Sequence, residues 1–451
     1  MPPLRDLTVT GIVFASLPII LKRPWVGVLM WIWLSVMNPH RLSWGFAYDL
    51  PFAQMVGIAL LIGFLCSKEP KRMPWSALVV VWVLFVGWMC VTTVFAYYPD
   101  WAMNGLERSL KIQIPTFLAL MIMYTRERLN MMVWVLTLSL AYFGTKGGVF
   151  TIMHGGEFLV WGPPQSFING NNELALALVT VIPLLWFMHI HAQNKWVRRA
   201  LLASLLLCIA SVIGSSSRGA FLAGGAMGMF LLWKSPKRAP ILAGLIVVVP
   251  LILALAPAKY WDRMNTIQNY QEDDSATGRL NAWQFAINLA SDYPITGAGF
   301  AAFNTTLFNR YAPDPSKVLV AHSNYFQVLA EHGYVGLFLY LMMLLLAWRA
   351  ASWTIRAARR EGDALRWHGD LARMCQVALV GYSLGGAFLS LTYFDLYYYI
   401  VAIIVLNRRL AAQLIAQRAG TAAPAAQPGA RAVQGVPPAI ASVPMRHGPG
   451  R

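Results

Sequence analysis

Long apolar runs occupy most of this chain, and one long polar segment, roughly Lys259 to Tyr334, interrupts them late in the sequence. A run of about 20 apolar residues is what a helix needs to cross the core of a bilayer. Only 12% of the residues are charged, whereas soluble domains contain about a quarter. Uninterrupted apolar runs exclude the alternating pattern of a membrane barrel, which leaves helices. We therefore predict an all-α polytopic integral membrane protein.

The apolar runs predict membrane helices over residues 52–66, 75–96, 109–124, 129–152, 173–192, 198–213, 217–233, 239–257, 335–355, 372–392 and 396–414. Lys22-Arg23-Pro24 divides residues 7–37 into two short runs, which form two spans or one broken span. The total is then about 12 or 13 spans, and we favour 12. The run Leu7–Leu21 resembles the core of a signal peptide, but more spans follow at once and we expect it to be retained.

The formal net charge of +17 invites a nucleic-acid interpretation, but its distribution contradicts one. Basic residues cluster after every second span, as the positive-inside rule predicts for cytoplasmic loops. The clusters lie at Lys68/Lys71/Arg72, Arg126/Arg128, Lys195/Arg198/Arg199, Lys234/Lys237/Arg238, between Arg349 and Arg373, and at Arg408/Arg409. We therefore attribute the charge to topology and expect no nucleic-acid partner. Both termini are predicted to be cytoplasmic, and the long polar segment is predicted to lie on the outer, periplasmic side.

Four parts follow from this topology. We expect an N-terminal transmembrane bundle over 1–257, a periplasmic helical segment over 258–334, C-terminal transmembrane helices over 335–415, and a disordered cytoplasmic tail over 416–451, which is rich in Ala, Pro and Gly. The four cysteines fall inside predicted spans without metal-like spacing, so we predict neither disulfides nor redox chemistry.

The periplasmic segment contains two expected helices. Residues 279–290 form an amphipathic pattern, with Ser275 and Thr277 available as caps, and Pro294 with the Gly297/Gly299 pair then turns the chain. A second helix is expected to begin near His322 and to end at Gly333. In it, Asn324 and Gln327 have the spacing of a capping box, and Asn324, Gln327 and Glu331 form one polar stripe.

Three outer-side groups are the candidate site: Arg218, Arg279 and His322. Each also has a simpler explanation, because an arginine at a span end can extend to the headgroups, an arginine on a surface helix can be solvated, and a histidine at a helix start can be structural. Serines precede Arg218 and Gly219 follows it, which allows close backbone approach and supplies donors. The functional interpretation depends on all three lying on one face of the membrane.

Such a cluster suits the transfer of a group from a lipid diphosphate to an acceptor hydroxyl. Two arginines can hold a diphosphate through charge-assisted hydrogen bonds and neutralise the charge that develops as it leaves. A histidine with a near-neutral pKa can deprotonate an incoming hydroxyl. Neither Asp-x-Asp nor His-Glu-x-x-His occurs, and we interpret Glu272-Asp273-Asp274 as a solvated turn. We therefore expect no metal and no cofactor.

Further candidates are weaker. Lys146 lies inside a predicted span near its outer end, where either a phosphate or a structural partner would satisfy its charge. Glu173 is a second acidic candidate, and Asn324, Gln327 and Glu331 are possible supporting residues. Tyr393, Asp395 and Tyr397 are expected at the last outer turn, as an interfacial aromatic belt rather than a sugar platform.

Three stretches resemble the blocks of the O-antigen ligase and polymerase superfamily. AHSNYFQVLAEHGYVGLFLY, from Ala321, is similar to its histidine motif. TGRLNAWQFAINLASDYPITGAGFAAF, from Thr277, is similar to its Arg-x3-Trp and Pro-x-x-Gly-x-Gly block, and GSSSRGAFLA, from Gly214, to its Ser-Arg-Gly block. The resemblance covers about residues 75–410. It departs at Ser323, where the family often has Asn, and Asn324 follows directly.

The resemblance implies a GT-C-like, metal-independent, inverting glycosyltransferase with a periplasmic site. It would transfer O-antigen glycan from undecaprenyl diphosphate to a lipid A–core hydroxyl in lipopolysaccharide biosynthesis, with membrane lipids around it. By motif match, Arg218 and Arg279 would hold the diphosphate and His322 would be the catalytic base. The alternative enzymes are a polymerase or a protein O-oligosaccharyltransferase of the same superfamily. The alternative outside the enzymes is a polyprenyl-glycan transporter. A transporter should show repeated halves with charges near the midplane, and neither is evident in the sequence.

Overall fold

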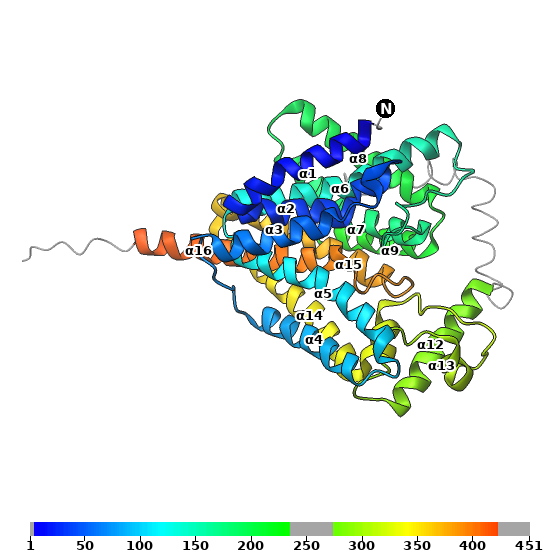
Figure 1. Ribbon diagram of the computed structural model, residues 1–451. Coiled ribbons are helices and arrows are strands. Elements are labelled where there is room, and N and C mark those ends of the chain that lie inside the picture. Colours follow the sequence, from blue (N-terminus) through cyan, green and yellow to red (C-terminus); the bar gives the residue numbers. More distant parts are fainter. Residues whose placement is uncertain (1–3, 235–273, 423–451) are drawn as a thin grey trace, which may run out of the picture. The chain divides into compact units, whose positions relative to one another are not determined.

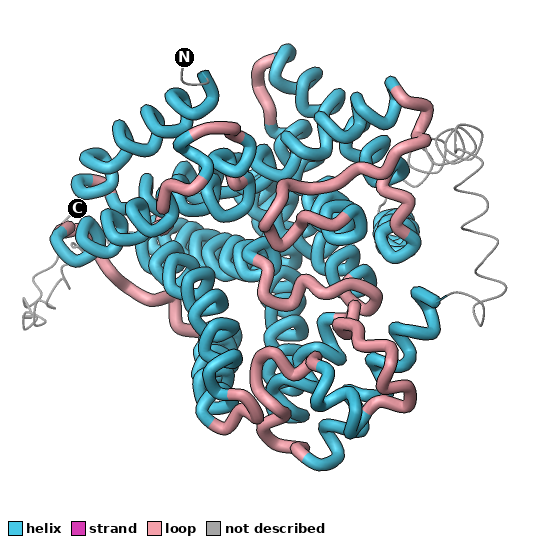
Figure 2. Tube along the Cα trace, turned by 45° about the vertical axis from the view of Figure 1, so that its right-hand side comes forward, coloured by secondary structure: helices cyan, strands magenta, loops and turns pink. Residues whose placement is uncertain are grey.

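The computed structural model describes residues 4–234 and 274–422, and all regular structure in these two ranges is helical. Figure 2 shows only helix and loop in them. The chain divides into two compact units, residues 1–412 and 413–451. The described part of the second unit is the last part of helix α16, and everything below concerns the first unit.

The N-terminal half contains α1 (Leu4–Lys22), α2 (Pro24–Ile32), the π-helical turn η1 (Trp33–Met37), the 3-10 turns η2 (Pro39–Leu42) and η3 (Phe46–Tyr48), α3 (Phe52–Cys66), α4 (Ala77–Val94), α5 (Pro99–Ile122), α6 (Arg126–Met153), α7 (Asn171–His191), α8 (Lys195–Gly214) and α9 (Arg218–Lys234). The later part contains α12 (Asp274–Asp292), α13 (Thr305–Tyr311), α14 (Asn324–Glu361), the 3-10 turn η4 (Gly362–Leu365), α15 (Arg366–Gly385) and α16 (Asp395–Ala422).

Seven helical stretches among the described residues are long and apolar enough to cross a membrane, with α14 and α15 counted as one, and two shorter apolar helices lie at Pro24–Met37 and Phe52–Cys66. This is the pattern of a multi-pass membrane protein. The total of 12 spans stays a prediction, and the span expected over 239–257 lies outside the described residues. Residues 7–37 form two helices, because Pro24 lacks a backbone N–H and takes the first position of α2.

Several helix boundaries differ from the expectation, among them the start of α5 and the end of α15. Helix α5 begins at Pro99, ten residues before the predicted start, because its first turns are amphipathic rather than apolar. Helix α15 ends at Gly385 instead of continuing to residue 392, and residues 386–394 form a loop before α16. That loop proves important for the site.

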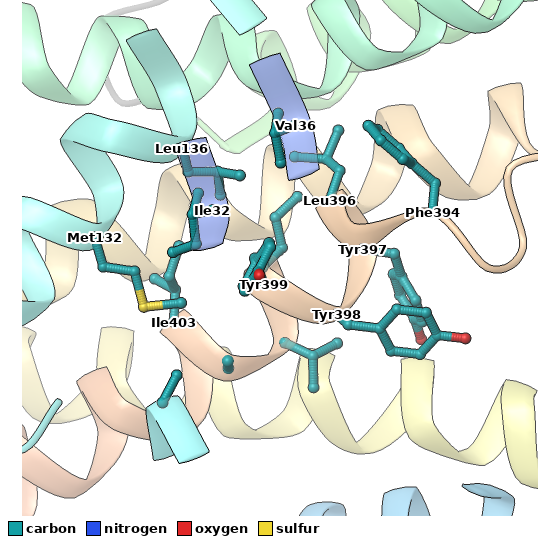
Figure 3. Packing of buried hydrophobic residues seen from close by; sticks show 14 of the residues in the cluster. Ile32, Val36, Met132, Leu136, Phe394, Leu396, Tyr397, Tyr398, Tyr399 and Ile403 are labelled. Atoms are coloured by element: carbon teal, nitrogen blue, oxygen red, sulfur yellow. The ribbon is translucent and has the colours of Figure 1, made fainter. Parts of the chain in front are cut away.

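The centre of the bundle is built around α16. Each residue from Asp395 to Leu406 is at most 5% exposed, and Figure 3 shows Tyr399 and Ile403 packed among Ile32, Met132 and Leu136. Tyr397 stacks on Tyr382 with ring centroids 4.8 Å apart. The expected interfacial belt is therefore wrong for Asp395 and Tyr397: a helix that is apolar on every side is buried inside the protein.

The helices of the predicted periplasmic segment have a small core of their own. In α12 and α13, Phe285 and Phe308 stack with centroids 4.1 Å apart, and Ala282 and Leu289 are buried with them. Helix α12 packs on α14, and Figure 1 shows α12 and α13 beside the start of that helix. This core gives the polar segment a rigid platform outside the main bundle.

A break in α14 fixes this platform. At Gly333 the backbone leaves the helical region, with φ of +66° and ψ of −170°. The sequence predicted that the helix expected to begin near His322 would end at this residue. The loop 294–299 fills the break: Ala298 and Gly299 donate to the carbonyls of Ala330 and Glu331 at 2.9 and 3.0 Å, and Tyr334 donates to Pro294 at 2.8 Å. Gly297, with φ of +62°, has the left-handed backbone that this turn requires.

Candidate functional site

Helix α12 and the turn before α14 bring Arg279 and His322 together. Trp283, one helical turn after Arg279, donates its indole N–H to the carbonyl of Ala321 at 2.8 Å. The same indole stacks on Phe326, with centroids 5.0 Å apart and planes 18° from parallel. These two contacts lie on either side of His322, and they hold it where the Arg279 guanidinium acts on its ring electrostatically.

His322 has an unusual backbone and an incompletely satisfied ring. Its φ is +44°, in the left-handed region that a residue with a Cβ rarely adopts, and such a conformation costs about 1–3 kcal/mol. The half-buried ring makes no hydrogen bond within the described part of the chain, and its Nδ1 is fully buried. Burial and, second, the Arg279 charge lower the pKa of His322. At neutral pH the ring is therefore neutral and has a lone pair available.

The three possible supporting residues form one hydrogen-bonded stripe, as their spacing predicted. The Oδ1 atom of Asn324 accepts from the backbone N–H of Leu391 at 2.7 Å, and Thr392 donates to Gln327 at 3.1 Å. Gln327 reaches Glu331 at 3.5 Å. The expected capping box is wrong, however: the helix cap is Ser323, without a side-chain cap bond, because Asn324 bonds to the loop between α15 and α16 instead.

This stripe continues into a buried chain of hydrogen bonds. Tyr393 lies 2.5 Å from Glu331 and 2.8 Å from Nε2 of His332, whose Nδ1 lies 2.7 Å from Thr92. A hydroxyl has one proton. In one assignment with a neutral imidazole, Thr92 donates to His332 rather than to the Met89 carbonyl at 3.1 Å, His332 donates to Tyr393, and Tyr393 donates to Glu331. The chain anchors the first turns of α14, and with them His322, to the loop after α15 and to α4.

Arg218 lies at the first position of α9, in a turn that is tied to the start of α7. Asn171 donates to the carbonyl of Ser215 at 2.8 Å, and the Ser217 hydroxyl accepts from the N–H of Ala220 at 3.4 Å. Glu173, two residues after Asn171, lies within electrostatic range of Arg279. The structure thus groups Arg279 with His322 and Glu173, and it places Arg218 in the turn that binds the same end of α7.

Lys146 occupies a different place. It lines a cavity of about 260 Å³ together with Phe143, Phe150, Trp161 and Pro163, and the lining contains none of Arg218, Arg279 and His322. The acidic run was interpreted as a solvated turn, and its residues Glu272 and Asp273 lie outside the described ranges. Ser275 and Thr277 lie within α12 rather than before it, so they do not cap it as expected.

Sequence reasoning missed Trp283, Thr392 and Tyr393 as parts of this region. Trp283 belongs to the Arg-x3-Trp block, and its i+4 spacing from Arg279 places both on one helix face, so this signal was present. Nothing in the sequence indicated Thr392 and Tyr393, because apolar residues surround them and they were assigned to the end of a span and an aromatic belt.

Two family models match the chain. Residues 203–341, which include Arg218, Arg279 and His322, match the family described as O-antigen ligase. Residues 4–193 match a family of unknown function, DUF5935. No curated protein gave a match. By the first of these matches, this multi-pass membrane protein contains an O-antigen ligase family domain over residues 203–341.

Proposed function

We propose that the protein is a glycosyltransferase that moves O-antigen polysaccharide from undecaprenyl diphosphate to a hydroxyl of lipid A–core at the periplasmic side of the inner membrane. The observation that carries the proposal is that the Arg279 guanidinium lies close to a neutral, half-buried His322. Both residues lie inside the stretch that matches the O-antigen ligase family.

This arrangement of Arg279 and His322 suits transfer of the glycan in a single displacement step. Arg279 and Arg218 hold the diphosphate of the donor, since guanidinium groups bind phosphate oxygens through two parallel hydrogen bonds. The acceptor hydroxyl attacks the anomeric carbon from the face opposite the diphosphate, and its proton passes to His322. The bond between the anomeric carbon and the diphosphate oxygen breaks, and undecaprenyl diphosphate leaves with its charge neutralised by the arginines. One displacement inverts the anomeric configuration.

The surroundings of His322 fit the role of a base. A general base works best when its neutral form prevails at the working pH, and burial together with Arg279 lowers the pKa of His322. Trp283 and Asn324 fix the turn on both sides of the residue. With both arginines on the diphosphate, no divalent ion is needed to neutralise it, so we propose a metal-independent reaction.

The test is a reconstitution with defined components. Purified protein, an undecaprenyl-diphosphate-linked glycan and rough lipopolysaccharide should give a ladder of products in the presence of a chelator. His322→Ala should abolish the ladder while the unfolding temperature stays near that of the wild type. His154→Ala is the matched control, because His154 is exposed and bonds only to its own helix, and it should retain activity. Full activity of His322→Ala would remove the proposed base, and a requirement for added metal would remove the two-arginine account.

The acceptor separates the ligase from its alternatives. A polymerase would extend a second donor glycan without lipopolysaccharide, and a protein O-oligosaccharyltransferase would modify a pilin-like protein. A transporter would move the donor across a vesicle membrane and give no ladder with any acceptor. Supplying the acceptors separately to the same preparation therefore distinguishes all four.

A further inference from the structure

A larger cavity lies at the opposite ends of the helices that carry the candidate site. Its volume is about 590 Å³, and its walls come from the last turns of α7 and α9, the late part of α14 and the first half of α15. Helices α7, α9 and α14 present their first residues to the site around His322 and their last residues to this cavity. Because α7 has 21 residues, its ends are about 30 Å apart, which is the thickness of a bilayer core.

Cationic side chains dominate the polar lining of the cavity. Lys234, Arg356, Arg359 and Arg373 face a single carboxylate, Asp370. Asp370 is already engaged, because it pairs with Arg373 and accepts from His191 at 3.2 Å. Lys234, Arg356 and Arg359 make no ion pair within residues 4–234 and 274–422, and all three are exposed. Counting only the described residues, the lining therefore has an excess of positive charge.

Most of the rest of the lining is apolar, and contacts between the helices hold it in place. Trp186, Phe230 and Val377 contribute to it. Two cross-contacts connect the helices around it: Gln376 donates to Ser352 at 2.7 Å, and the rings of Phe230 and Trp348 lie with centroids 5.5 Å apart. A small, water-soluble anion would use only the cationic part of such a cavity. A ligand with an anionic head and an apolar body would use both.

We propose that this cavity binds an anionic phospholipid, with the phosphodiester held by Arg356, Arg359 and Lys234 and the first part of the acyl chains against the apolar wall. The volume is within the range of small-molecule sites, roughly 300–1,000 Å³. Basic pockets between membrane helices are known to hold anionic lipid headgroups, and guanidinium groups match phosphate oxygens in geometry. The positive-inside pattern predicts that this end of the bundle is cytoplasmic, on the leaflet opposite the proposed reaction. The inference does not rest on the proposed function.

The experiment compares two double variants of the full-length protein in neutral detergent. Arg356→Gln with Arg359→Gln removes two cations that line the cavity. Arg349→Gln with Arg360→Gln removes the same charge from exposed positions of the same helix that are outside the lining. Native mass spectrometry counts bound lipid, and thermal unfolding reports stabilisation, each with added phosphatidylglycerol, phosphatidylcholine or inorganic phosphate.

We expect phosphatidylglycerol to bind to the wild type and to the control variant and to raise their unfolding temperatures. Binding to the cavity variant should be at least tenfold weaker, and phosphatidylcholine and inorganic phosphate should have little effect on any protein. Equal binding of phosphatidylglycerol to the two variants would refute the site, because it would reflect general charge attraction. If inorganic phosphate raised the unfolding temperature comparably, the occupant would not be a lipid. If phosphatidylcholine did so, the cavity would not select an anionic headgroup.

Discussion

The Tyr393 hydroxyl lies 2.5 Å from the carboxylate of Glu331 and 2.8 Å from Nε2 of His332. It thereby joins the loop after α15 to the first turns of α14, whose leading turn carries His322. Glu331 is 5% exposed and His332 is fully buried, so water cannot easily replace the hydroxyl. This contact connects the stability of the bundle to the position of the proposed base.

Tyr393→Phe should therefore destabilise the protein. It removes one hydroxyl, so the Glu331 carboxylate and Nε2 of His332 each lose a hydrogen bond. A buried atom that loses its only hydrogen bond costs about 1–3 kcal/mol. Thermal unfolding of the purified protein should show a clear decrease in midpoint. Tyr334→Phe is the control, since Tyr334 is 50% exposed and its hydroxyl makes no hydrogen bond among the described residues. Equal midpoints for the two variants would show that the Tyr393 hydroxyl is dispensable.

Gly333→Ala should be more damaging than an ordinary glycine substitution in a helix. At Gly333 φ is +66°, and an added Cβ would lie 2.3 Å from the carbonyl oxygen of Ile295. This backbone conformation, which essentially only glycine adopts, costs about 1–3 kcal/mol for a residue with a Cβ, and the clash displaces the loop that fills the break in α14. Reduced yield of folded protein and a lower unfolding midpoint are the expected results.

The control for that prediction is Gly87→Ala in α4. No atom lies within 4 Å of a Cβ there, and alanine favours a helix over glycine by up to about 1 kcal/mol. Gly87→Ala should be neutral or stabilising. If Gly333→Ala behaved in the same way, the pairing of loop 294–299 with the broken helix would not be needed for the fold.

The sequence predicted most of the helices, because the length of an apolar run directly reflects the thickness of the bilayer. It could not distinguish α16 from a lipid-facing helix, since lipid and protein interior select the same apolar residues. Tyr397 and Asp395 were misplaced for this reason. Arg279 and His322 could be chosen as candidates because their motifs are local. Their relation to Glu173 stays hidden in the sequence because it depends on how α7 and α12 pack.

Trp283→Phe should test how His322 is positioned. Phenylalanine keeps an aromatic ring against Phe326 but loses the hydrogen bond to Ala321. A neutral hydrogen bond contributes about 1 kcal/mol, which corresponds to roughly a fivefold change in rate. We expect kcat to fall by about this factor while KM for the donor changes little. For Trp283→Ala, which also loses the stacking, kcat should fall further. A rise in donor KM with unchanged kcat would assign Trp283 to donor binding instead.

The titration of His322 should respond to Arg279 in a defined direction. Burial is the larger cause of its lowered pKa and the Arg279 charge the smaller. Arg279→Gln removes only the second cause, so the pKa should rise but stay below the usual value for histidine, about 6.5. Between the folded and the unfolded pKa of His322 the unfolded chain binds the proton first, so falling pH destabilises the fold in that window.

NMR of the protein with ¹³C-labelled histidine rings measures the titration midpoint of His322, and the His322→Gln variant assigns its signal. Arg310→Gln in α13, whose side chain pairs with Asp292, should leave it unchanged, and an unchanged midpoint in Arg279→Gln would show that the two groups are not coupled.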